Sequence, residues 1–381
     1  VINTMNIHYL DNASTTKPAP QVVDTVVKCL TTDYGNPSSL HKMGLNAQLY
    51  MDNARKSIAK AICCTPENIV FTSGATESSN IAILGTAKVY GKRKKRVVTT
   101  TIEHASVKEC FNELERQGFE VVRITPNAMG ETTVEDIVNA VNQDTILISC
   151  MLVNNETGYI LPIEKAYTII KKKFPEVITH CDCVQGFLKL PINTRTLKAD
   201  LISISGHKVH APKGVGVLYV GKGIKTAKYN LGGKQERGYR SGTEALPNIA
   251  GLGTAVDILY NTISSRYEYV NSLRTYLLDR LSNLDYVTIN SKPNGSPYVV
   301  NISILGIRSE IMLHFLEEYG IYVSSGSACS KGEKSGVLGY FGLSDALSDS
   351  AIRISFSEYN STDDIDALID AIQLGVKKIM K

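Results

Sequence analysis

Short apolar runs alternate with longer amphipathic stretches between residues 55 and 220. The runs have the length and the β-branched content of buried strands, and the stretches between them are long enough for helices. Strands that alternate with helices form a mainly parallel sheet with helices on both faces. The predicted strands are NIVFTSG, RVVTTTI, EVVRIT, TILISCMLV, EVITHCD, LISIS and GVGVLYV.

The pattern changes beyond residue 248. Residues 249–284 have apolar positions at three- and four-residue spacing and no proline, which predicts one long helix joining two domains. The segment that follows mixes strands and helices. We therefore expect an α/β fold class, with a large domain at residues 15–258 and a small α+β domain formed by residues 1–14 and 259–381.

Composition and charge narrow the class of protein. With 381 residues and a mean hydropathy of −0.05, the chain can bury one large core and a smaller one. The net charge of +4 is spread thinly, and the basic run at 92–96 is typical of a solvated loop, so no nucleic-acid partner is expected. We find no run of eighteen apolar residues and no signal-like start, so we expect a cytoplasmic protein without a membrane partner.

A lysine follows one predicted strand directly. Lys208 comes after LISIS, in the segment Ser205-Gly206-His207-Lys208. An amine at a strand end can point into a cleft, where partial loss of water lowers its pKa and allows a Schiff base with an aldehyde cofactor. Most lysines are solvated surface groups, but the flanking serine, glycine and histidine favour the catalytic interpretation.

Two other strand ends offer complementary groups. Asp182 ends the strand EVITHCD, where a carboxylate is costly unless it is paired. Pairing with a pyridinium nitrogen would make pyridoxal phosphate an electron sink, whereas a helix cap or a structural salt bridge explains the same residue equally well. Ala75 and Thr76 open a helix after FTSG, and its free amides could hold a phosphate, although such a segment is often only a cap.

Histidines and cysteines near these strand ends suggest a metal centre as an alternative. The two thiols of a Cys-x-Cys strand face the same way, but we find no second ligand pair at a recognised zinc spacing. We therefore expect no metal. The residues concerned are His180, Cys181, Cys183, His207 and His210.

Nine motifs occur in an order that resembles the cysteine desulfurases of iron–sulfur assembly and tRNA thiolation, in the fold-type-I pyridoxal-phosphate superfamily. The resemblance covers nearly the whole chain, from YLDNASTT at Tyr9 to RISFSEYN ending at Asn360. It implies a mainly parallel seven-stranded sheet between helices in the large domain. The motifs are GNPSSLH, FTSGATES, TIEHASV, VNNETG, HCDCVQ, SGHK, ERGYRSGT, SSGSACS and AIRIS.

The resemblance implies a role for each residue around the cofactor ring. Lys208 would hold pyridoxal 5'-phosphate in a Schiff base, and Asp182 would pair with the pyridine nitrogen. Gln185 would reach the phenolic oxygen. His104 would stack on the ring and assist proton transfer, and Asn155 would contact the ring or the substrate carboxylate.

The resemblance also implies how the phosphate is held. Thr76 beside Ala75, together with Ser205 and His207, would bind it from one subunit. Thr243 would reach in from a second subunit, so an obligate homodimer is expected. Hydroxyls, amides and imidazole are all groups that phosphate accepts as partners.

The segment SSGSACSKGEKSG, residues 324–336, contains Cys329 among small and polar residues. Nothing in this segment can anchor a core, so we expect a mobile loop whose exposed thiol accepts sulfur and delivers it. The cysteines outside the motifs are expected to be inert, buried packing. These are Cys29, Cys63, Cys64, Cys110 and Cys150.

Arg353 is the one charged residue in the strand AIRISF. Its two-pronged guanidinium suits a substrate carboxylate, and an edge-strand arginine facing solvent is the alternative. The resemblance implies conversion of L-cysteine to L-alanine, with sulfur held as a persulfide on Cys329 and passed to an acceptor protein, an iron–sulfur scaffold or a tRNA-thiolation enzyme. Alternatives are a selenocysteine lyase, another enzyme of the superfamily such as an aminotransferase, or an inert scaffold or metal-binding protein.

The chain departs from the pattern of the resembling proteins at three positions. Lys234 stands where a glycine or small polar residue is expected, Glu358 where an arginine is expected, and Cys183 where alanine is usual. We expect none of them to touch the chemistry directly.

Overall fold

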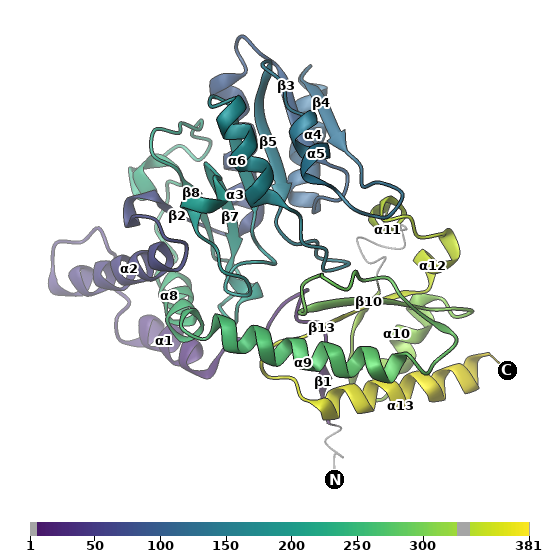
Figure 1. Ribbon diagram of the computed structural model, residues 1–381. Coiled ribbons are helices and arrows are strands. Elements are labelled where there is room, and N and C mark those ends of the chain that lie inside the picture. The colour runs from purple at the N-terminus through teal and green to yellow at the C-terminus, as the bar shows by residue number, and fades with distance from the viewer. Residues whose placement is uncertain (1–5, 326–335, 381) are drawn as a thin grey trace.

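A large sheet with helices on both faces lies beside a smaller unit that the long helices α9 (Ile263–Leu281) and α13 (Thr362–Ile379) cross (Figure 1). The computed structural model describes residues 6–325 and 336–380, so the predicted sulfur carrier Cys329 lies outside the described residues.

All seven predicted strands join one sheet in the order β2-β8-β7-β6-β5-β3-β4. Pairing is parallel except at β8, which runs antiparallel to both of its neighbours. The mainly parallel α/β class is therefore confirmed. The strands are β2 (Ile69–Thr72), β3 (Arg96–Thr100), β4 (Glu120–Ile124), β5 (Thr145–Met151), β6 (Ile178–Asp182), β7 (Leu201–Ser205) and β8 (Gly216–Val220).

Neighbouring residues of β2 enter different cores, because side chains alternate across a sheet. Val70 packs with α3 (Ala75–Tyr90) and α4 (Ala105–Arg116), whereas Ile69 and Phe71 belong to the core on the other face. Burial on both faces explains why the strands read as continuous apolar runs. Helices of the second face are α1 (Pro20–Thr31), α2 (Lys42–Ala61), α5 (Val134–Asn139), α6 (Ile163–Lys173), α7 (Thr194–Leu197) and α8 (Leu246–Tyr260).

A separate core is built by an antiparallel sheet of order β12-β13-β10-β9, by the helices packed on it, and by Leu10 from the N-terminal segment. The pairing of β1 with β11 brings that segment to this unit. The domain limits 15–258 and 1–14 plus 259–381 stay predictions, and Phe341 and Leu343 of the second range pack with the core of the large sheet. The elements are β1 (His8–Tyr9), β9 (Val287–Ile289), β10 (Val299–Ile304), α10 (Ser309–Glu317), β11 (Ile321–Tyr322), β12 (Ser324–Ser325), α12 (Asp345–Asp349) and β13 (Ala351–Ser355). The short helix α11 (Gly336–Tyr340) instead packs through Val337 against the core of the large sheet.

The single long helix expected at 249–284 is wrong. The chain forms α8 and α9, separated at Asn261 and Thr262, where Thr262 leaves the helical region with φ −115°. Arg266 stabilises the break, because its guanidinium donates to the Leu259 carbonyl at 2.9 Å and to the Thr262 hydroxyl at 3.1 Å. Apolar periodicity continues across this corner, so the pattern alone does not reveal it.

One expected buried cysteine is also wrong. Cys63 is exposed, with φ +58°, in the left-handed turn that ends α2, and this turn directs its side chain outward. Cys29, Cys110 and Cys150 are buried as expected, and Cys64 is half-buried. Among residues 6–325 and 336–380, no helix combines the length and apolarity needed to cross a membrane.

The smaller core should depend strongly on Ile302, which is fully buried in the middle of β10. Ile302→Ala is expected to reduce the free energy of unfolding by about 2–5 kcal/mol, because it leaves a cavity that the core cannot close. Thermal unfolding measures the change. Ile311→Ala, on the exposed side of α10, is the matched control and should change stability by less than about 0.5 kcal/mol; equal effects would contradict this view of the core.

Candidate active site

One cavity of about 760 Å³ collects most of the predicted site residues at the carboxyl ends of the parallel strands. Open α/β sheets place their ligands at this edge, and the size is that of a small-molecule site. The predicted residues on its wall are Ala75, Thr76, His104, Asn155, Asp182, Gln185, Ser205, His207, Lys208 and Arg353.

Lys208 lies in a short turn that continues β7, and its side chain reaches the cavity. Its amine donates to the carbonyl oxygens of Ala13 at 2.8 Å and Ser14 at 2.5 Å. Burial, and then the positive charge of Arg353, lower the pKa of Lys208 to about 8. The amine therefore gains or loses a proton more easily than an ordinary lysine does.

Asp182 ends β6, and its carboxylate is almost fully buried at the cavity wall. Among the described residues it accepts one hydrogen bond, from the Val184 amide at 2.9 Å. Burial raises the pKa of Asp182, and the Val184 amide, His104 and Lys208 oppose that rise. A cation placed against the free side of this carboxylate would offset its lost hydration.

His104 forms the N-cap of α4, and the surface it exposes lies on the wall of the cavity. Its Nδ1 accepts a hydrogen bond from the Ser106 amide at 3.1 Å. Burial lowers the pKa of His104, and the charge of Lys208 lowers it further while Asp182 raises it. A neutral imidazole ring with a fixed orientation therefore faces the cavity.

Glu103 is a neighbour that the sequence did not indicate as functional. It is fully enclosed, and its Oε1 accepts hydrogen bonds from the Thr100 hydroxyl at 2.6 Å and from the Met151 amide at 2.9 Å. Burial raises its pKa to about 8, so the side chain is mostly protonated near neutral pH. These bonds join the ends of β3 and β5 behind His104.

The start of α3 forms the opposite wall of the cavity. Gly74 is its N-cap and makes no side-chain bond, so the amides of the first turn point outward, as at an anion site. Ser205 and His207 line the same cavity. A Cβ on Gly216 would come within 2.6 Å of the Gly74 backbone, so glycine at that position of β8 lets this segment sit directly on the sheet.

Burial lowers the pKa of His207 to about 4, with further lowering by Lys208 and Lys213. His207 is therefore neutral near pH 7. Its Nδ1 lies 3.2 Å from the Thr15 hydroxyl, and its backbone carbonyl accepts from the Thr16 amide at 2.9 Å. The N-terminal segment thus fixes the turn that carries Lys208.

Arg353 faces the cavity from β13 and is not a solvent-facing edge residue. Its Nη2 donates to Asp11 Oδ1 at 2.9 Å and to the Ser324 hydroxyl at 3.0 Å. Its Nη1 donates to the Asn155 carbonyl at 3.2 Å, and its Nε is buried without a partner among the described residues. Asp11 lies within the motif YLDNASTT, but nothing local in that motif points to a partner 342 residues away.

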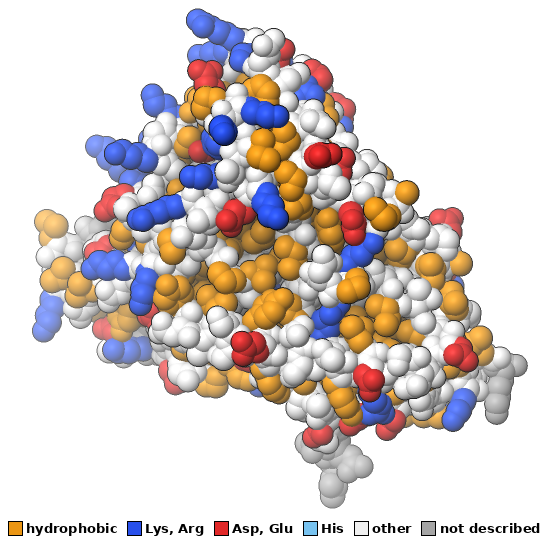
Figure 2. Space-filling view, viewed as in Figure 1, with side chains coloured by type: hydrophobic (Ala, Val, Ile, Leu, Met, Phe, Trp, Pro, Cys, Tyr) orange, Lys and Arg blue, Asp and Glu red, His pale blue; other side chains and the backbone are white. Residues whose placement is uncertain are grey.

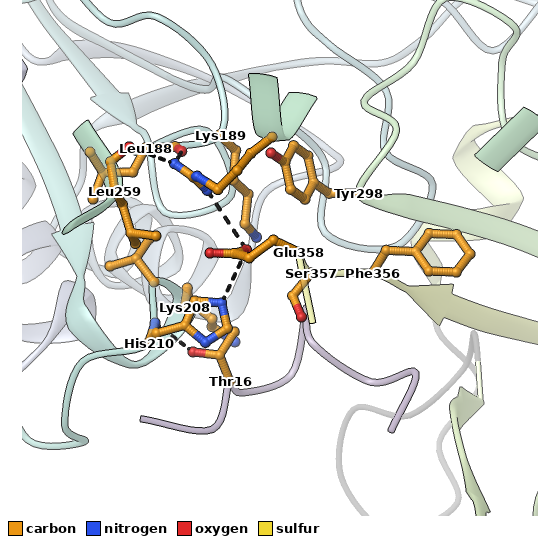
Figure 3. Close-up of a pocket in the computed structure, with 12 residues that line it drawn as sticks. Thr16, Leu188, Lys189, Lys208, His210, Leu259, Tyr298, Phe356, Ser357 and Glu358 are labelled. Atoms are coloured by element: carbon orange, nitrogen blue, oxygen red, sulfur yellow. Dashed lines mark hydrogen bonds and ion pairs between the residues drawn. The ribbon is translucent and has the colours of Figure 1, made fainter. Parts of the chain in front are cut away.

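Gln185 lies in the turn after β6, and its amide is held at both ends. Its Nε2 donates to the Ala13 carbonyl at 2.9 Å, and its Oε1 accepts from the amine of Lys189 at 2.9 Å. Lys189 is a buried residue that sequence reasoning missed. It also lines a much smaller cavity of about 10 Å³ behind Lys208 (Figure 3).

Two predicted residues are not brought to this cavity. Thr243 is exposed and is not on the described wall of the cavity in its own chain. Cys329 falls outside the described residues. All the roles predicted for the site residues stay predictions.

The histidines and cysteines of the metal alternative have other partners. His180 is buried, with Nδ1 at 2.7 Å from the Ser149 hydroxyl and Nε2 at 2.9 Å from the Ser203 hydroxyl. Burial lowers its pKa to about 3. Within the described ranges, no three residues of the ligating types gather as they would around a metal ion.

Comparison with known proteins places this geometry in a family. The profile described as aminotransferase class-V matches residues 8–368. The chain belongs to the class-V aminotransferase family. This family member is 39% identical to the cysteine desulfurase IscS of Vibrio vulnificus over 379 residues, covering 97% of the chain and 93% of that protein.

Two solved structures extend the comparison. A NifS-like protein superposes on this class-V chain with a TM-score of 0.92 at 36% identity, covering 98% of this chain and all of the other. A structure described as SspA in complex with cysteine gives 0.82 at 32% identity, covering 93% and 99%. The predicted resemblance to cysteine desulfurases, and with it the fold-type-I architecture, is confirmed.

The residues around the cavity fit pyridoxal phosphate. A nearly buried carboxylate has a free side, a lysine has a depressed pKa, and a helix N-terminus presents amides, all on one cavity. These groups suit a pyridinium nitrogen, an aldehyde and a phosphate, respectively.

The depressed pKa of Lys208 predicts unusual reactivity of its amine. In the cofactor-free protein, labelling of Lys208 by acetic anhydride should rise with pH through a midpoint near 8, because only the neutral amine reacts. Mass spectrometry of the labelled peptide measures the profile. Arg353→Met should move the midpoint to higher pH, since it removes a positive charge that lowers the pKa; a midpoint at the ordinary lysine value of about 10.4 in the unmodified protein would contradict the assignment.

Proposed function

We propose that this cysteine desulfurase binds pyridoxal phosphate through Lys208, binds L-cysteine through Arg353, and receives the substrate sulfur on Cys329. The observation that carries the proposal is the convergence of Lys208, Asp182, His104 and Arg353 on one cavity. Lys208 has the lowered pKa, and Arg353 the positive charge, that these roles require.

The cofactor would be held at three points. Asp182 would accept a hydrogen bond from the pyridine nitrogen, His104 would lie against the ring, and the amides of Ala75 and Thr76 with Ser205 and His207 would bind the phosphate. When bound, pyridoxal phosphate supplies an electron-withdrawing ring that makes the Cα proton of an attached amino acid acidic. The amine of Lys208, with a pKa of about 8, is suited to accept that proton and return it.

Arg353 would select an α-amino acid by its carboxylate. The bonds to Asp11, Ser324 and the Asn155 carbonyl hold the guanidinium in one orientation before substrate arrives. A preorganised fork binds a carboxylate with less loss of side-chain freedom. Asn155 lies on the same wall and supports the carboxylate.

Transfer of sulfur to Cys329 balances without an external oxidant. L-Cysteine and the thiol of Cys329 give L-alanine and a persulfide: the carbon–sulfur bond of the substrate breaks, a sulfur–sulfur bond forms, and the β-carbon gains a proton. An acceptor thiol then takes the outer sulfur by attack on that bond. The location of Cys329 in a segment of small and polar residues supports this role.

A homodimer is supported by the exposed surface of α1 and α2. Large apolar side chains are exposed along these helices and the loop between them, and Figure 2 shows part of this surface over α2. Surfaces of this kind mark association. The side chains are Val23, Val27, Leu30, Tyr34, Leu40, Leu45 and Leu49.

The segment that carries Thr243 is anchored at its base and exposed at Thr243. Glu236 is buried, pairs with Arg55 at 2.5 Å, and accepts from the Phe71 amide at 2.8 Å. This anchoring would present Thr243 to the phosphate in a second copy. The sulfur acceptor is proposed, by relationship to IscS, to be an iron–sulfur scaffold or a tRNA-thiolation enzyme, and a cytoplasmic location stays a prediction from the sequence.

Replacement of Cys329 by alanine tests the proposed sulfur route. Cys329→Ala should abolish persulfide formation and reduce release of alanine from L-cysteine at least about 100-fold, because the sulfur has no acceptor on the chain. Mass spectrometry of the protein and alanine analysis measure both. Cys63→Ala, at the exposed cysteine of the described residues, is the control and should react like the unmodified chain. Borohydride should attach pyridoxal to Lys208 in all three proteins, and a Cys329→Ala variant of full activity would refute the route.

The dimer proposal predicts a mass in solution of twice the 41.6 kDa of one chain. Leu30→Asp combined with Leu49→Asp should shift the protein towards monomer, because a charge would be buried on each side of the interface. Thr243→Ala should weaken binding of pyridoxal phosphate about tenfold without changing the mass. Analytical ultracentrifugation and cofactor titration measure these effects, and a monomer that binds the cofactor normally would contradict the shared site.

A further inference from the structure

The turn after β6 carries a lysine whose amine is directed at a cofactor-facing side chain. Backbone bonds from Lys189 to the Gly186 carbonyl at 3.0 Å, and from Phe187 to the Cys183 carbonyl at 2.7 Å, close this turn, and Leu188 adopts the left-handed conformation with φ +55°. This turn brings the side chains of Gln185 and Lys189, four residues apart, together. The Lys189 amine reaches Gln185 Oε1 at 2.9 Å.

The two bonds of Gln185 determine which way its amide points. Oε1 accepts from Lys189, and Nε2 donates to the Ala13 carbonyl. A flipped amide would set its NH₂ group against the amine and its oxygen against a carbonyl, so both bonds would be lost. Nε2 keeps a second N–H, and Gln185 lies on the cavity wall.

Lys189 has few other partners. It is 5% exposed, and none of the described carboxylates lies within 4 Å of its amine. The ring of Tyr298 lies 5.6 Å from the amine and offers a weak cation–π contact. Burial and the charge of Lys208 lower the pKa of Lys189 to about 7, while Glu358 opposes this. Burying an amine with so few partners costs folding free energy, and the hydrogen bond to Gln185 offsets part of that cost.

Glu358 is the acidic residue of the small cavity, whose described wall also carries Lys189, Lys208 and Arg266. Its carboxylate lies 3.4 Å from His210 Nε2 and 3.8 Å from Arg266 Nη1, and Figure 3 shows the Lys189 side chain reaching toward it. The resemblance leads us to expect an arginine at this position. In this chain an arginine would add a cation to a group of cations, whereas Glu358 supplies the negative charge that lets Lys189 remain there.

We propose that Lys189, whose charge Glu358 offsets, is a positioning residue that fixes the amide of Gln185 with its N–H group toward the cofactor. The inference rests on the proposed binding of pyridoxal phosphate in the large cavity. Neither Lys189 nor Glu358 touches the cofactor in this scheme. Both act through Gln185.

A double-mutant cycle tests the proposal with the complete protein and pyridoxal phosphate. Lys189→Met keeps an unbranched side chain one atom shorter and removes the donor. It should displace the visible absorption maximum of the bound cofactor and weaken cofactor binding about tenfold, the effect of one lost buried hydrogen bond. In a Gln185→Ala background the same substitution should change neither quantity, because coupled residues are not additive.

Two outcomes overturn the proposal: a Lys189→Met variant with the absorption maximum and affinity of the unmodified protein, or equal effects in both backgrounds. The second result would mean that Lys189 contributes only packing. Glu358→Gln, which keeps the shape of the side chain, should displace the absorption maximum in the same direction. If Lys189→Met does not fold, the absorption maximum of Glu358→Gln tests the positioning role instead.

The matched control is Lys171→Met. Lys171 is a partly buried lysine of α6 that pairs with Asp200 and donates to the Val177 carbonyl at 2.7 Å, near the start of β6 and far along the strand from the cavity. The Lys171→Met variant should leave the cofactor spectrum unchanged. If the unmodified protein shows no cofactor band and no borohydride attachment at Lys208, the proposed function fails; if both are present and Lys189→Met is silent, only the positioning role fails.

Discussion

The site depends on one backbone oxygen in an N-terminal segment that touches both cores. The carbonyl of Ala13 accepts hydrogen bonds from the Lys208 amine and from the Gln185 amide. The same segment bonds to Ser355 of β13, since the Ala13 amide donates to its hydroxyl at 2.8 Å. The residues that would hold the cofactor and those that would hold the substrate are therefore placed by the same few residues of chain.

Charge is the second constraint on the cavity. Lys208, Lys213 and Arg353 face it, and Asp182 supplies a buried negative charge at its base. A surplus of cations around a partly closed space favours ligands that carry phosphate and carboxylate groups. Burial, and after it the charge of Arg353, keep the pKa of Lys208 low, so Arg353 both attracts the ligands and adjusts the amine.

Features that depend on local residue patterns could be predicted from the sequence. Every strand of the large sheet follows from a β-branched apolar run, and the wall residues follow from motifs at strand ends. Contacts between distant segments could not be predicted from local patterns. Asp11 meets Arg353, and Glu103 accepts a hydrogen bond from Met151, only after the chain folds. The corner at Asn261 was missed because apolar spacing continues through it, and the exposure of Cys63 depends on a left-handed turn that composition does not signal.

The corner between α8 and α9 has a consequence for substrate choice. Arg353 lies in β13 of the smaller unit, whereas Lys208 follows β7 of the large sheet. The distance between the guanidinium of Arg353 and the amine of Lys208 therefore depends on how the two cores pack. This distance would have to match the separation between the amino and carboxylate groups of the substrate. Substitutions at the corner, where Arg266 bonds both the Leu259 and Leu188 carbonyls, would therefore change how well an α-amino acid fits without touching the cavity.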